Sequence, residues 1–341
     1  MAIKVQSFMS NQPTEGNFPV TLLEDTIFVQ VSVRLSVLEA LVFKQTCEEL
    51  IVANSTLKKI IIDFAQTTFM DSSGLGALVS NFKNAQEKGI ELVLQNVTPQ
   101  VMAVLNLTGL VDVFTIEEGE FVPPSTHTRR GEELPETHPS VRSLTKRLID
   151  IVGALVGLVI TGILSIPIII AITIDDPGPI FFGQTRCGWM GKHFKMWKFR
   201  SMCVDAEAKK AELQRLNQVQ GAFFKIDNDP RVTQVGRLLR RTSLDELPQF
   251  WNVLKGEMSL VGTRPPTPDE VGCYEVPEWQ RLDVKPGMTG EWQVNGRSSI
   301  RNFEDVIRLD LEYQKNWNLM YDLKLIFKTV AILFNKSSGA M

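Results

Sequence analysis

Histidine and cysteine are scarce in this sequence of 341 residues, which contains three histidines and four cysteines. The cysteines lie far apart and include no Cys-x-x-Cys pair, so their spacing argues against a zinc site and is typical of a reducing compartment. His127 and His138 fall in a stretch rich in Pro, Glu and Thr, so catalysis by histidine is not expected. The net charge of −3 gives no overall reason to expect a nucleic-acid partner. Residues 1–8 lack the apolar core of a signal peptide, and none is expected.

The longest stretch without charge runs from Ile151 to Ile174, with Asp150 before it and Asp175 and Asp176 after it. A helix of this length reaches about 36 Å at about 1.5 Å per residue, enough for the apolar layer of a bilayer. A buried core helix is the alternative, but such helices usually carry a polar stripe and this stretch carries none. We therefore predict a membrane helix.

The interior of this stretch contains two patterns that affect helices. Pro167, with Gly162 shortly before it, removes a backbone hydrogen bond and is expected to kink the helix. Gly153 and Gly157 form a Gly-x-x-x-Gly pair, which in membranes also mediates helix dimerisation. The second pattern is weak by itself and leaves a homo-oligomer as an open expectation.

Basic residues lie on both sides of the stretch, with Lys146 and Arg147 before it and Arg186 and Lys198 after it. Because basic residues mark the cytoplasmic side of a membrane helix, both ends are expected on that side. We therefore favour a re-entrant helix, which enters the membrane, breaks near Gly162–Pro167 and returns, over a helix that crosses it. Both termini would then lie at the cytoplasmic face of the inner (plasma) membrane.

Residues 1–118 alternate between two kinds of apolar pattern. The strand-like runs are 18–33, 59–64 and 90–94, and the runs with helical spacing are 38–52, 75–88 and 98–107. Strands that alternate with helices indicate an α/β unit, in which a sheet is covered by helices.

The polar group from Asp71 to Gly74, DSSG, separates a buried strand from the next helix. Asp71 or Ser72 can cap that helix, and a phosphate on Ser72 or Ser73 would lie at its positive end. The segment IIIDFAQTTFMDSSGLGAL (60–78) resembles the STAS domain of anti-sigma-factor antagonists, over about residues 15–118. The resemblance implies that Ser72 is phosphorylated by a partner kinase. A plain helix cap in a domain that only docks a protein partner is the alternative.

Asp245 and Glu246 are adjacent acids in a region that is otherwise basic. The neighbouring cations are Arg231, Arg237, Arg240, Arg241, Lys255 and Arg264. Cations keep a carboxylate ionised, and arginine matches the geometry of phosphate. Such a carboxylate can attack phosphorus and hold an acyl-phosphate, while its neighbour can bind Mg²⁺.

The same residues allow a structural interpretation. Ser243-Leu-Asp-Glu246 has the pattern of a capping box at a helix start. Pro248 instead allows a helix that starts later and leaves the two acids on an exposed turn. The sequence does not decide between these geometries.

The chain from about 143 to 335 resembles the monotopic phosphoglycosyl transferases, also called bacterial sugar transferases. The matching segments are KRLID (146–150), DDPGPIFFGQTRCG (175–188), KMWKFRSM (195–202), RRTSLDELPQFWNVLKGEMSLVGTRPP (240–266) and KPGMTGEWQVNGR (285–297). The resemblance implies transfer of a sugar-1-phosphate from a UDP-sugar to polyprenyl (undecaprenyl) phosphate through an aspartyl phosphosugar. That reaction initiates exopolysaccharide or other glycoconjugate synthesis. A membrane-tethered STAS regulatory protein with an inactive transferase-like half is the alternative.

The resemblance also assigns roles to single residues. It implies that Asp245 is the nucleophile and that Glu246 holds Mg²⁺. It places phosphate and substrate contacts at Lys198, Arg240, Arg264, Asn295 and Arg297. One feature departs from the family, which often breaks its membrane helix at a Ser-Pro pair, whereas here Gly162 and Ile163 take that place.

These interpretations divide the chain into four regions and predict an α/β fold class. The regions are a STAS-like sheet with helices at 1–118, a flexible linker at 119–143, a re-entrant helix with its exit turn at 144–182, and an α-rich α/β catalytic domain at 183–341. Two amphipathic helices are expected between Phe303 and Phe334, and the second is suited to lie on the bilayer surface.

Overall fold

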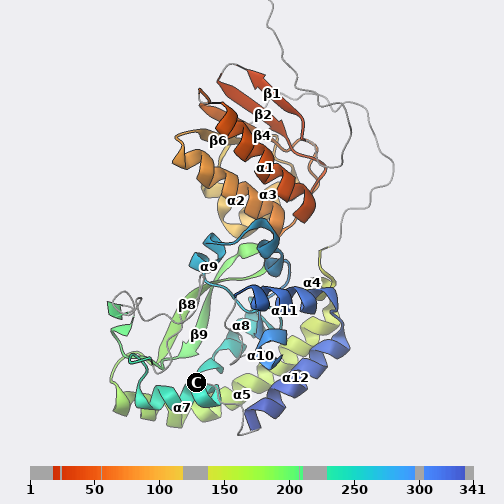
Figure 1. Cartoon of the computed structure of the whole chain (residues 1–341). Helices are drawn as coiled ribbons and strands as arrows, with labels where there is room; N and C mark the ends of the chain where they lie inside the picture. Colours follow the sequence, from red (N-terminus) through yellow and green to blue (C-terminus); the bar gives the residue numbers. More distant parts are fainter. Residues whose placement is uncertain are drawn as a thin grey trace, which may run out of the picture. The chain divides into compact units, whose positions relative to one another are not determined.

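The computed structural model describes residues 18–23, 25–54, 56–117, 137–206, 208–209, 229–295 and 303–334 (Figure 1). The described residues form two compact units. The first contains those of Met1–Thr137 with Met190–Lys192 and Tyr274–Asp283, and the second contains those of His138–Trp189, His193–Cys273 and Val284–Met341. The predicted domains differ from this grouping, because the segment Tyr274–Asp283 belongs to the first unit although it was placed in the catalytic domain.

The first unit is built on a five-stranded sheet in the order β1-β2-β4-β6-β7. Its strands are β1 (Val20–Leu23), β2 (Thr26–Gln30), β4 (Lys59–Asp63), β6 (Glu91–Gln95) and β7 (Thr115–Glu117). Only β1 pairs antiparallel with its neighbour, and the other pairs are parallel. The central strand β4 carries three consecutive buried isoleucines, because a parallel strand covered on both faces needs an apolar run rather than an alternation.

Three helices accompany this sheet at the places where the sequence predicts them. They are α1 (Val37–Ala53), α2 (Ser72–Glu87) and α3 (Pro99–Thr108), and a short pair, β3 (Arg34–Leu35) with β5 (Phe69–Met70), precedes α1 and α2. Asp71 caps α2 by accepting a hydrogen bond from the Gly74 amide at 2.9 Å. Gly89 and Gly109 follow α2 and α3 with φ of 69° and 73°, which glycine adopts without steric cost. The α/β prediction is confirmed.

The second unit is rich in helices and contains two small two-stranded sheets. One is the antiparallel hairpin of β8 (Phe181–Cys187) and β9 (His193–Phe199), and the other pairs β10 (Ser259–Val261) with β11 (Gly287–Thr289) in parallel. The short turn η2 (Trp189–Gly191) follows β8 in the chain, and its last two residues group with the first unit. The helices are α4 (Pro139–Arg142), α5 (Leu144–Asp175), α7 (Gln234–Thr242), α8 (Gln249–Lys255), α9 (Pro268–Gly272), α10 (Glu291–Asn295), α11 (Phe303–Lys315) and α12 (Leu319–Phe334).

The predicted linker ends earlier than expected. Helix α4 occupies Pro139–Arg142, and the Ser143 hydroxyl caps α5 by accepting from the Lys146 amide at 3.2 Å. Proline at the first helical position and a serine cap explain why these residues are helical despite their polar composition. Residues 118–136 of the predicted linker lie outside the described residues.

Helix α5 contains the whole apolar stretch and is continuous through Pro167. Among the described residues it is the one helix long and apolar enough to cross a membrane. Only 17% of its most apolar stretch is buried. The helix therefore does not end at the predicted break, although its ribbon changes direction in its middle part (Figure 1). Pro167 leaves the Ile163 carbonyl oxygen without its helical donor, and the Ser165 hydroxyl donates to the neighbouring Gly162 carbonyl oxygen at 2.8 Å.

One face of α5 packs on its own unit along both halves of the helix. In the first half, a Cβ at Gly153 would lie 2.5 Å from Leu260, and one at Gly157 would lie 2.5 Å from Phe250. These two glycines thus serve close packing within the unit. In the second half, Ile168 is in the cluster that contains Phe199 and Leu239.

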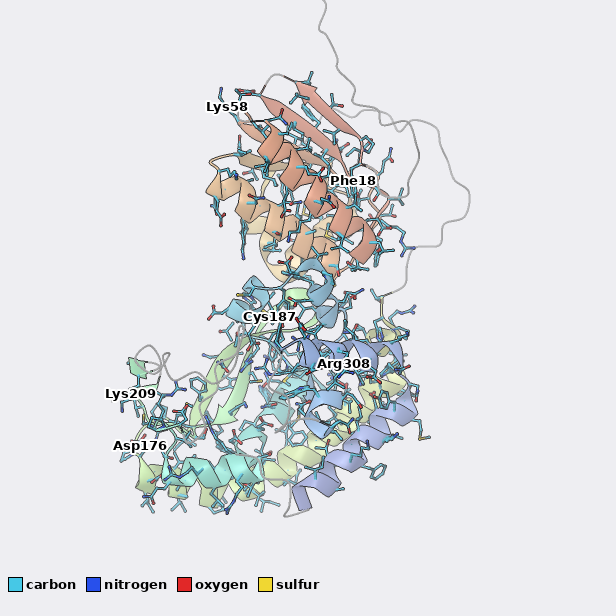
Figure 2. All side chains as sticks on the ribbon, in the orientation of Figure 1. Phe18, Lys58, Asp176, Cys187, Lys209 and Arg308 are labelled. Atoms are coloured by element: carbon cyan, nitrogen blue, oxygen red, sulfur yellow. The ribbon has the colours of Figure 1, made fainter. Side chains whose placement is uncertain are left out.

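The opposite face of α5 is apolar and exposed. Its exposed large side chains are Leu144, Leu148, Val152, Leu155, Val156, Val159, Ile160, Ile163, Ile166, Ile170 and Ile174. Asp176, labelled in Figure 2, follows the helix, and the Arg200 guanidinium donates to its Oδ2 at 2.8 Å.

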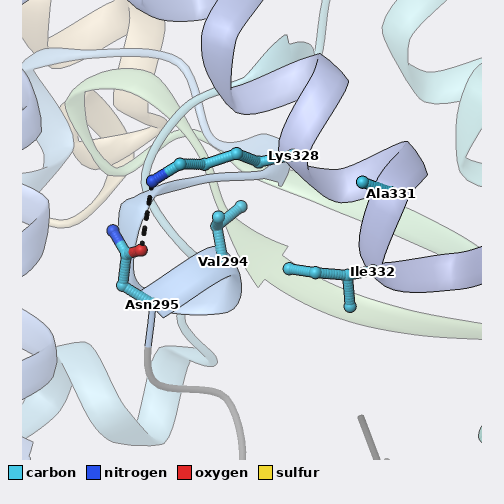
Figure 3. A pocket seen from close by; sticks show the side chains of 5 residues that line it. All are labelled: Val294, Asn295, Lys328, Ala331 and Ile332. Carbon is cyan, nitrogen blue, oxygen red and sulfur yellow. Dashed lines mark hydrogen bonds between the residues drawn. The ribbon is translucent and has the colours of Figure 1, made fainter. Parts of the chain in front are cut away.

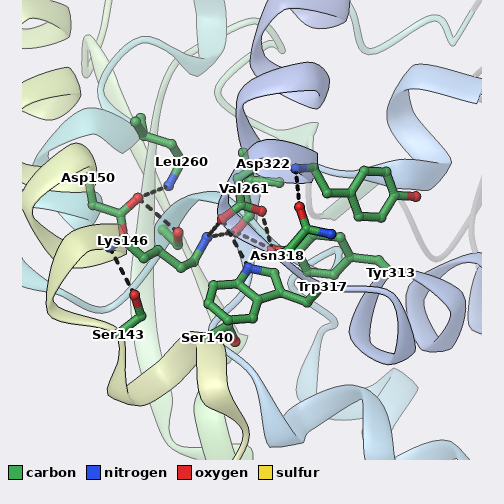
Figure 4. A network of polar contacts seen from close by, with 12 residues as sticks. Ser140, Ser143, Lys146, Asp150, Leu260, Val261, Tyr313, Trp317, Asn318 and Asp322 are labelled. Atoms are coloured by element: carbon green, nitrogen blue, oxygen red, sulfur yellow. Dashed lines mark hydrogen bonds and ion pairs between the residues drawn. The ribbon is translucent and has the colours of Figure 1, made fainter.

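A buried polar network joins the start of α5 to α12 (Figure 4). Lys146 Nζ lies 2.6 Å from Asp322 Oδ2 and 2.9 Å from the Val261 carbonyl oxygen. The Tyr313 hydroxyl and the Trp317 indole donate to the same carboxylate at 2.8 and 3.1 Å. Lys146, Tyr313 and Trp317 thus all donate to this buried carboxylate and compensate for its charge.

The rest of the KRLID segment also has structural roles. Asp150 accepts from the Ser259 hydroxyl and the Leu260 amide, both at 2.9 Å. Arg147 donates to the carbonyl oxygens of Val253 and Leu254 at 2.7 Å each, and so satisfies free acceptors in the last turn of α8.

Candidate active site

The two predicted catalytic acids lie on a short 3₁₀ turn, η4 (Leu244–Glu246), between α7 and α8. Ser243 ends α7 with a left-handed φ of 56° and gives the turn no side-chain cap, so the capping-box interpretation is wrong. Helix α8 starts only after Pro248, as the second interpretation allows. That interpretation needs one correction, since Asp245 is 6% exposed and is therefore buried in the turn.

Strand β9 and helix α7 each bring one predicted cation to the acid pair. Lys198 Nζ lies 2.9 Å from Glu246 Oε1, and the side chains are 27% and 28% exposed. Arg240 is in the last turn of α7, and its Nε donates to the Ser201 hydroxyl at 2.9 Å. Burial lowers the pKa of Arg240, and the charge of Asp245 is the largest effect that opposes this. The structure therefore brings Asp245, Glu246, Lys198 and Arg240 together.

A second group of charged residues surrounds Arg264, which follows β10. Both of its terminal nitrogens donate to Glu270, at 2.8 and 3.2 Å. Burial alone would raise the pKa of Glu270, but the charge and hydrogen bonds of Arg264 hold it below the ordinary value. Glu270 also completes a capping box with Thr267 at the start of α9, so this carboxylate fixes the orientation of Arg264.

Arg186 on β8 connects the two groups and was not among the predicted site residues. Burial lowers its pKa to about 10, the charge of Arg264 adds to this effect, and Glu270 and Glu246 oppose it. Its Nη1 donates to the Pro265 carbonyl oxygen at 2.8 Å. The available signal was its place in the motif DDPGPIFFGQTRCG, but among many basic residues it was interpreted as a flank of the apolar helix.

The arrangement gives the two carboxylates different environments. Asp245 is buried beside a guanidinium, whereas Glu246 is partly exposed and paired with an ammonium group. Cations around a partly open carboxylate also attract phosphate groups, because lysine and arginine donate to their oxygens. The site can therefore hold a phosphorylated ligand next to a carboxylate.

The predicted Mg²⁺ is compatible with Glu246 as a single protein ligand. Among the described residues, no three or more His, Cys, Asp or Glu side chains gather in a way that could hold a metal ion. Mg²⁺ is often bound by one or two carboxylates together with substrate phosphates rather than by a protein cage. The partly exposed carboxylate of Glu246 fits this mode of binding.

The remaining predicted residues lie elsewhere. Asn295 ends α10 and lines an open pocket of about 280 Å³ with Val294, Lys328, Ala331 and Ile332 (Figure 3). Its Oδ1 lies 3.4 Å from Lys328 Nζ, and its amide nitrogen donates to Glu291. This side chain is thus engaged with α10 and α12.

Two further predicted positions complete the set. Arg297 lies outside the described residues. Ser72 belongs to the first unit, where it is fully buried at the start of α2. Its position at a helix N-terminus is the predicted one, and its burial was not predicted.

Comparison with known proteins matches each half of the chain to a family. The model of the family described as bacterial sugar transferase matches residues 141–336, and the STAS domain model matches residues 18–120. Galactosyl transferase CpsE of Streptococcus agalactiae is 48% identical over 190 residues, which is 56% of this chain and 42% of the relative. UDP-glucose:undecaprenyl-phosphate glucose-1-phosphate transferase of Escherichia coli K12 is 43% identical over 197 residues, 56% of this chain and 40% of the relative.

A shorter relative is covered almost completely. Exopolysaccharide production protein ExoY of Rhizobium meliloti is 38% identical over 213 residues, which is 60% of this chain and 94% of that protein. In contrast, the matched part spans only about two fifths of CpsE and of the Escherichia coli transferase. All three alignments are long enough to involve the second unit, which contains the acid pair.

Proposed function

Because the chain belongs to the bacterial sugar transferase family, we propose that it transfers a sugar-1-phosphate from a UDP-sugar to undecaprenyl phosphate and so initiates a polysaccharide or another glycoconjugate. The observation that carries this proposal is the turn of Asp245 and Glu246, bordered by Lys198 and Arg240. The names of two relatives, a UDP-glucose:undecaprenyl-phosphate transferase and an exopolysaccharide production protein, support the substrate classes.

The first step is attack of an Asp245 carboxylate oxygen on the phosphorus that bears the sugar. An O–P bond forms on Asp245, the bridging P–O bond breaks, and UMP leaves with the electron pair. Arg240, beside Asp245, stabilises negative charge on the carboxylate and on the phosphoryl oxygens. Lys198, next to Glu246, is placed to do the same for the diphosphate.

In the second step, the Asp245 carboxylate is the leaving group and the lipid phosphate is the nucleophile. A phosphate oxygen of undecaprenyl phosphate attacks the phosphorus on Asp245, the acyl-phosphate bond breaks, and the carboxylate is released with its electron pair. The product is an undecaprenyl diphosphate sugar. Mg²⁺, bound at Glu246 and substrate phosphates, would neutralise charge that develops on the phosphoryl oxygens.

The lipid substrate requires that the site be near a membrane, and α5 supports this. Both halves of the helix pack on the second unit, while the opposite face exposes many large apolar side chains. A helix whose two halves contact one folded unit is better suited to enter one leaflet and return than to cross. We therefore place the unit on the cytoplasmic face, with α12 as a second contact, since it exposes Met320, Phe327 and Val330.

The test is release of UMP by the full chain in lipid nanodiscs, with a panel of UDP-sugars and undecaprenyl phosphate. Asp245→Asn should abolish release with folding unchanged, because an amide is a poor nucleophile, while the exposed acid variant Asp269→Asn should behave as wild type. Turnover near wild type in Asp245→Asn would remove this residue as nucleophile. No UMP with any donor would favour a STAS binding protein with an inactive transferase half.

A further inference from the structure

A segment of the transferase match packs on the STAS domain. Residues Tyr274–Asp283, which include the 3₁₀ helix η5 (Val276–Asp283), group with the first unit although they lie within the matched range 141–336. The segment lies against α1 and α2 of that unit. The segment is therefore part of the packing of the first unit.

The central contact of this segment is with Ser72 at the start of α2. Asp283 Oδ1 accepts from the Ser72 amide at 3.1 Å and from the Ser72 hydroxyl at 2.6 Å. The hydroxyl also lies 2.6 Å from the Trp279 carbonyl oxygen. The first amides of a helix have no partner within the helix and attract anions, so a carboxylate at this position is favourable.

Two further contacts fit the segment to this face. A Cβ at Gly76, one turn after Ser72, would lie 2.5 Å from the Trp279 ring, so the glycine is what allows the indole to approach the helix. At the edge, Lys44 Nζ on α1 lies 2.7 Å from Glu275 Oε2. The segment thus contacts this face in three ways: the Asp283 carboxylate lies at the N-terminus of α2, the Trp279 ring packs on Gly76, and Glu275 forms an ion pair with Lys44 at the edge.

We propose that Tyr274–Asp283 is an intramolecular ligand of the STAS domain, and that docking of this segment and phosphorylation of Ser72 exclude each other. The Ser72 hydroxyl is fully buried, and its single proton is shared between Asp283 Oδ1 and the Trp279 carbonyl oxygen, each 2.6 Å from the hydroxyl oxygen. A kinase that transfers the γ-phosphoryl group of ATP to this oxygen forms an O–P bond, breaks the β–γ bridge, and releases ADP and the hydroxyl proton. The donor is then lost, and phosphoryl oxygens face the Asp283 carboxylate and the Trp279 carbonyl.

The docking is tested without any measurement of turnover, so the result is independent of the proposed reaction. Hydrogen–deuterium exchange is followed in the full chain in nanodiscs for peptides that cover 274–283. Gly76→Ala favours the helix but inserts a methyl group against Trp279. We expect roughly tenfold faster exchange in the segment, while β4 stays protected. Ser80→Ala, further along α2, should leave the segment unchanged. Unchanged exchange in Gly76→Ala would overturn the docking.

The exclusion is tested at Ser72 itself. Ser72→Ala removes the hydroxyl but adds no charge, whereas Ser72→Glu adds a carboxylate opposite Asp283. We expect exchange of the segment to increase more in the glutamate variant than in the alanine variant, again with β4 protected. Asp283→Ala should release the segment without any change at Ser72, which separates undocking from damage to the STAS fold. Equal exchange in Ser72→Glu and wild type would contradict the exclusion.

Discussion

At the scale of single residues, the candidate site depends on which charges are neighbours. The sequence showed an acidic pair among many cations, and the structure selects Lys198 for Glu246 and Arg240 for Asp245. Arg186 escaped prediction because its importance comes from two residues, Glu246 and Arg264, that are distant from it in the chain. The turn at Ser243 could not be predicted because the same letters satisfy a capping box, and only tertiary packing selects the left-handed φ.

Lys198 gives a direct test of the electrostatic role of the site. Lys198→Met removes the ammonium group next to Glu246 and should lower the rate of UMP release by roughly 10²-fold, because charge that develops on the phosphoryl oxygens loses a partner. Lys195→Met, at an exposed position of the same strand, should have little effect. Steady-state kinetics with one UDP-sugar measure both variants. Equal rates for the two would assign Lys198 a purely structural role.

Asp71 predicts a pH dependence of the first unit. Burial and, secondly, the charge of Asp283 raise the pKa of Asp71 to about 7 from its ordinary value of 3.8, while hydrogen bonds from the amides of Gly74 and Ser73 lower it and the charge of Glu39 raises it slightly. The folded unit therefore binds this proton more tightly than the unfolded chain. Its contribution to stability is full below about pH 4 and is lost as pH rises through about 7.

Thermal unfolding of the full chain between pH 5 and pH 8.5 measures this effect. The transition of the first unit should move to lower temperature as pH rises, and Asp71→Asn should flatten the slope, because an amide still caps the helix but does not titrate. An Asp71→Asn slope equal to that of wild type would assign the pH dependence to other groups.

At the scale of elements, the spacing of apolar residues predicted most helices and strands of the first unit. The run at 59–64 became β4, and the segments after Ser73 and Thr98 became α2 and α3, because caps and glycines agree there with the periodicity. The role of the KRLID motif was not predictable, since Lys146, Arg147 and Asp150 find their partners in β10, α8 and α12. Sequence alone does not show which distant element a buried charge contacts.

The contact between α5 and α12 can be tested through its buried ion pair. Lys146→Met leaves the Asp322 carboxylate without its cation, and the two side chains are only 7% and 4% exposed. We expect a loss of about 3–5 kcal/mol in unfolding free energy, and a smaller loss when Asp322→Leu is added, because no unpaired charge then remains. Denaturant unfolding in detergent measures both.

A surface ion pair provides the matched control. Lys58 and Asp25 are paired at 2.9 Å with side chains that are 80% and 41% exposed, so solvent screens the pair and Lys58→Met should change the unfolding free energy little. If Lys146→Met costs no more than this control, the network does not fix α5 to α12.

At the scale of the whole molecule, the chain combines a STAS domain with a transferase unit that carries an apolar helix. The sequence motifs identified both families but assigned Tyr274–Asp283 to the transferase part alone. The spacing of apolar residues in that segment does not distinguish it from the rest of the transferase part. Its grouping with the first unit depends on complementary contacts at Ser72 and Gly76.

Membrane topology is the prediction at this scale. Reporter tags at residue 1 and at residue 341 should both be cytoplasmic, because both halves of α5 pack on the same unit. Protease protection of the two tags in spheroplasts measures this. Tags on opposite sides would mean that α5 crosses the membrane.

The central claim, that Asp245 takes up the sugar-phosphate, is tested most directly by mass spectrometry after rapid quench with the donor alone. The intact protein should gain the mass of one phosphosugar, the modified peptide should be the one that contains Asp245, and added undecaprenyl phosphate should discharge it. A protein that releases UMP only when the lipid is present, and never carries the adduct, would contradict the account in favour of direct transfer.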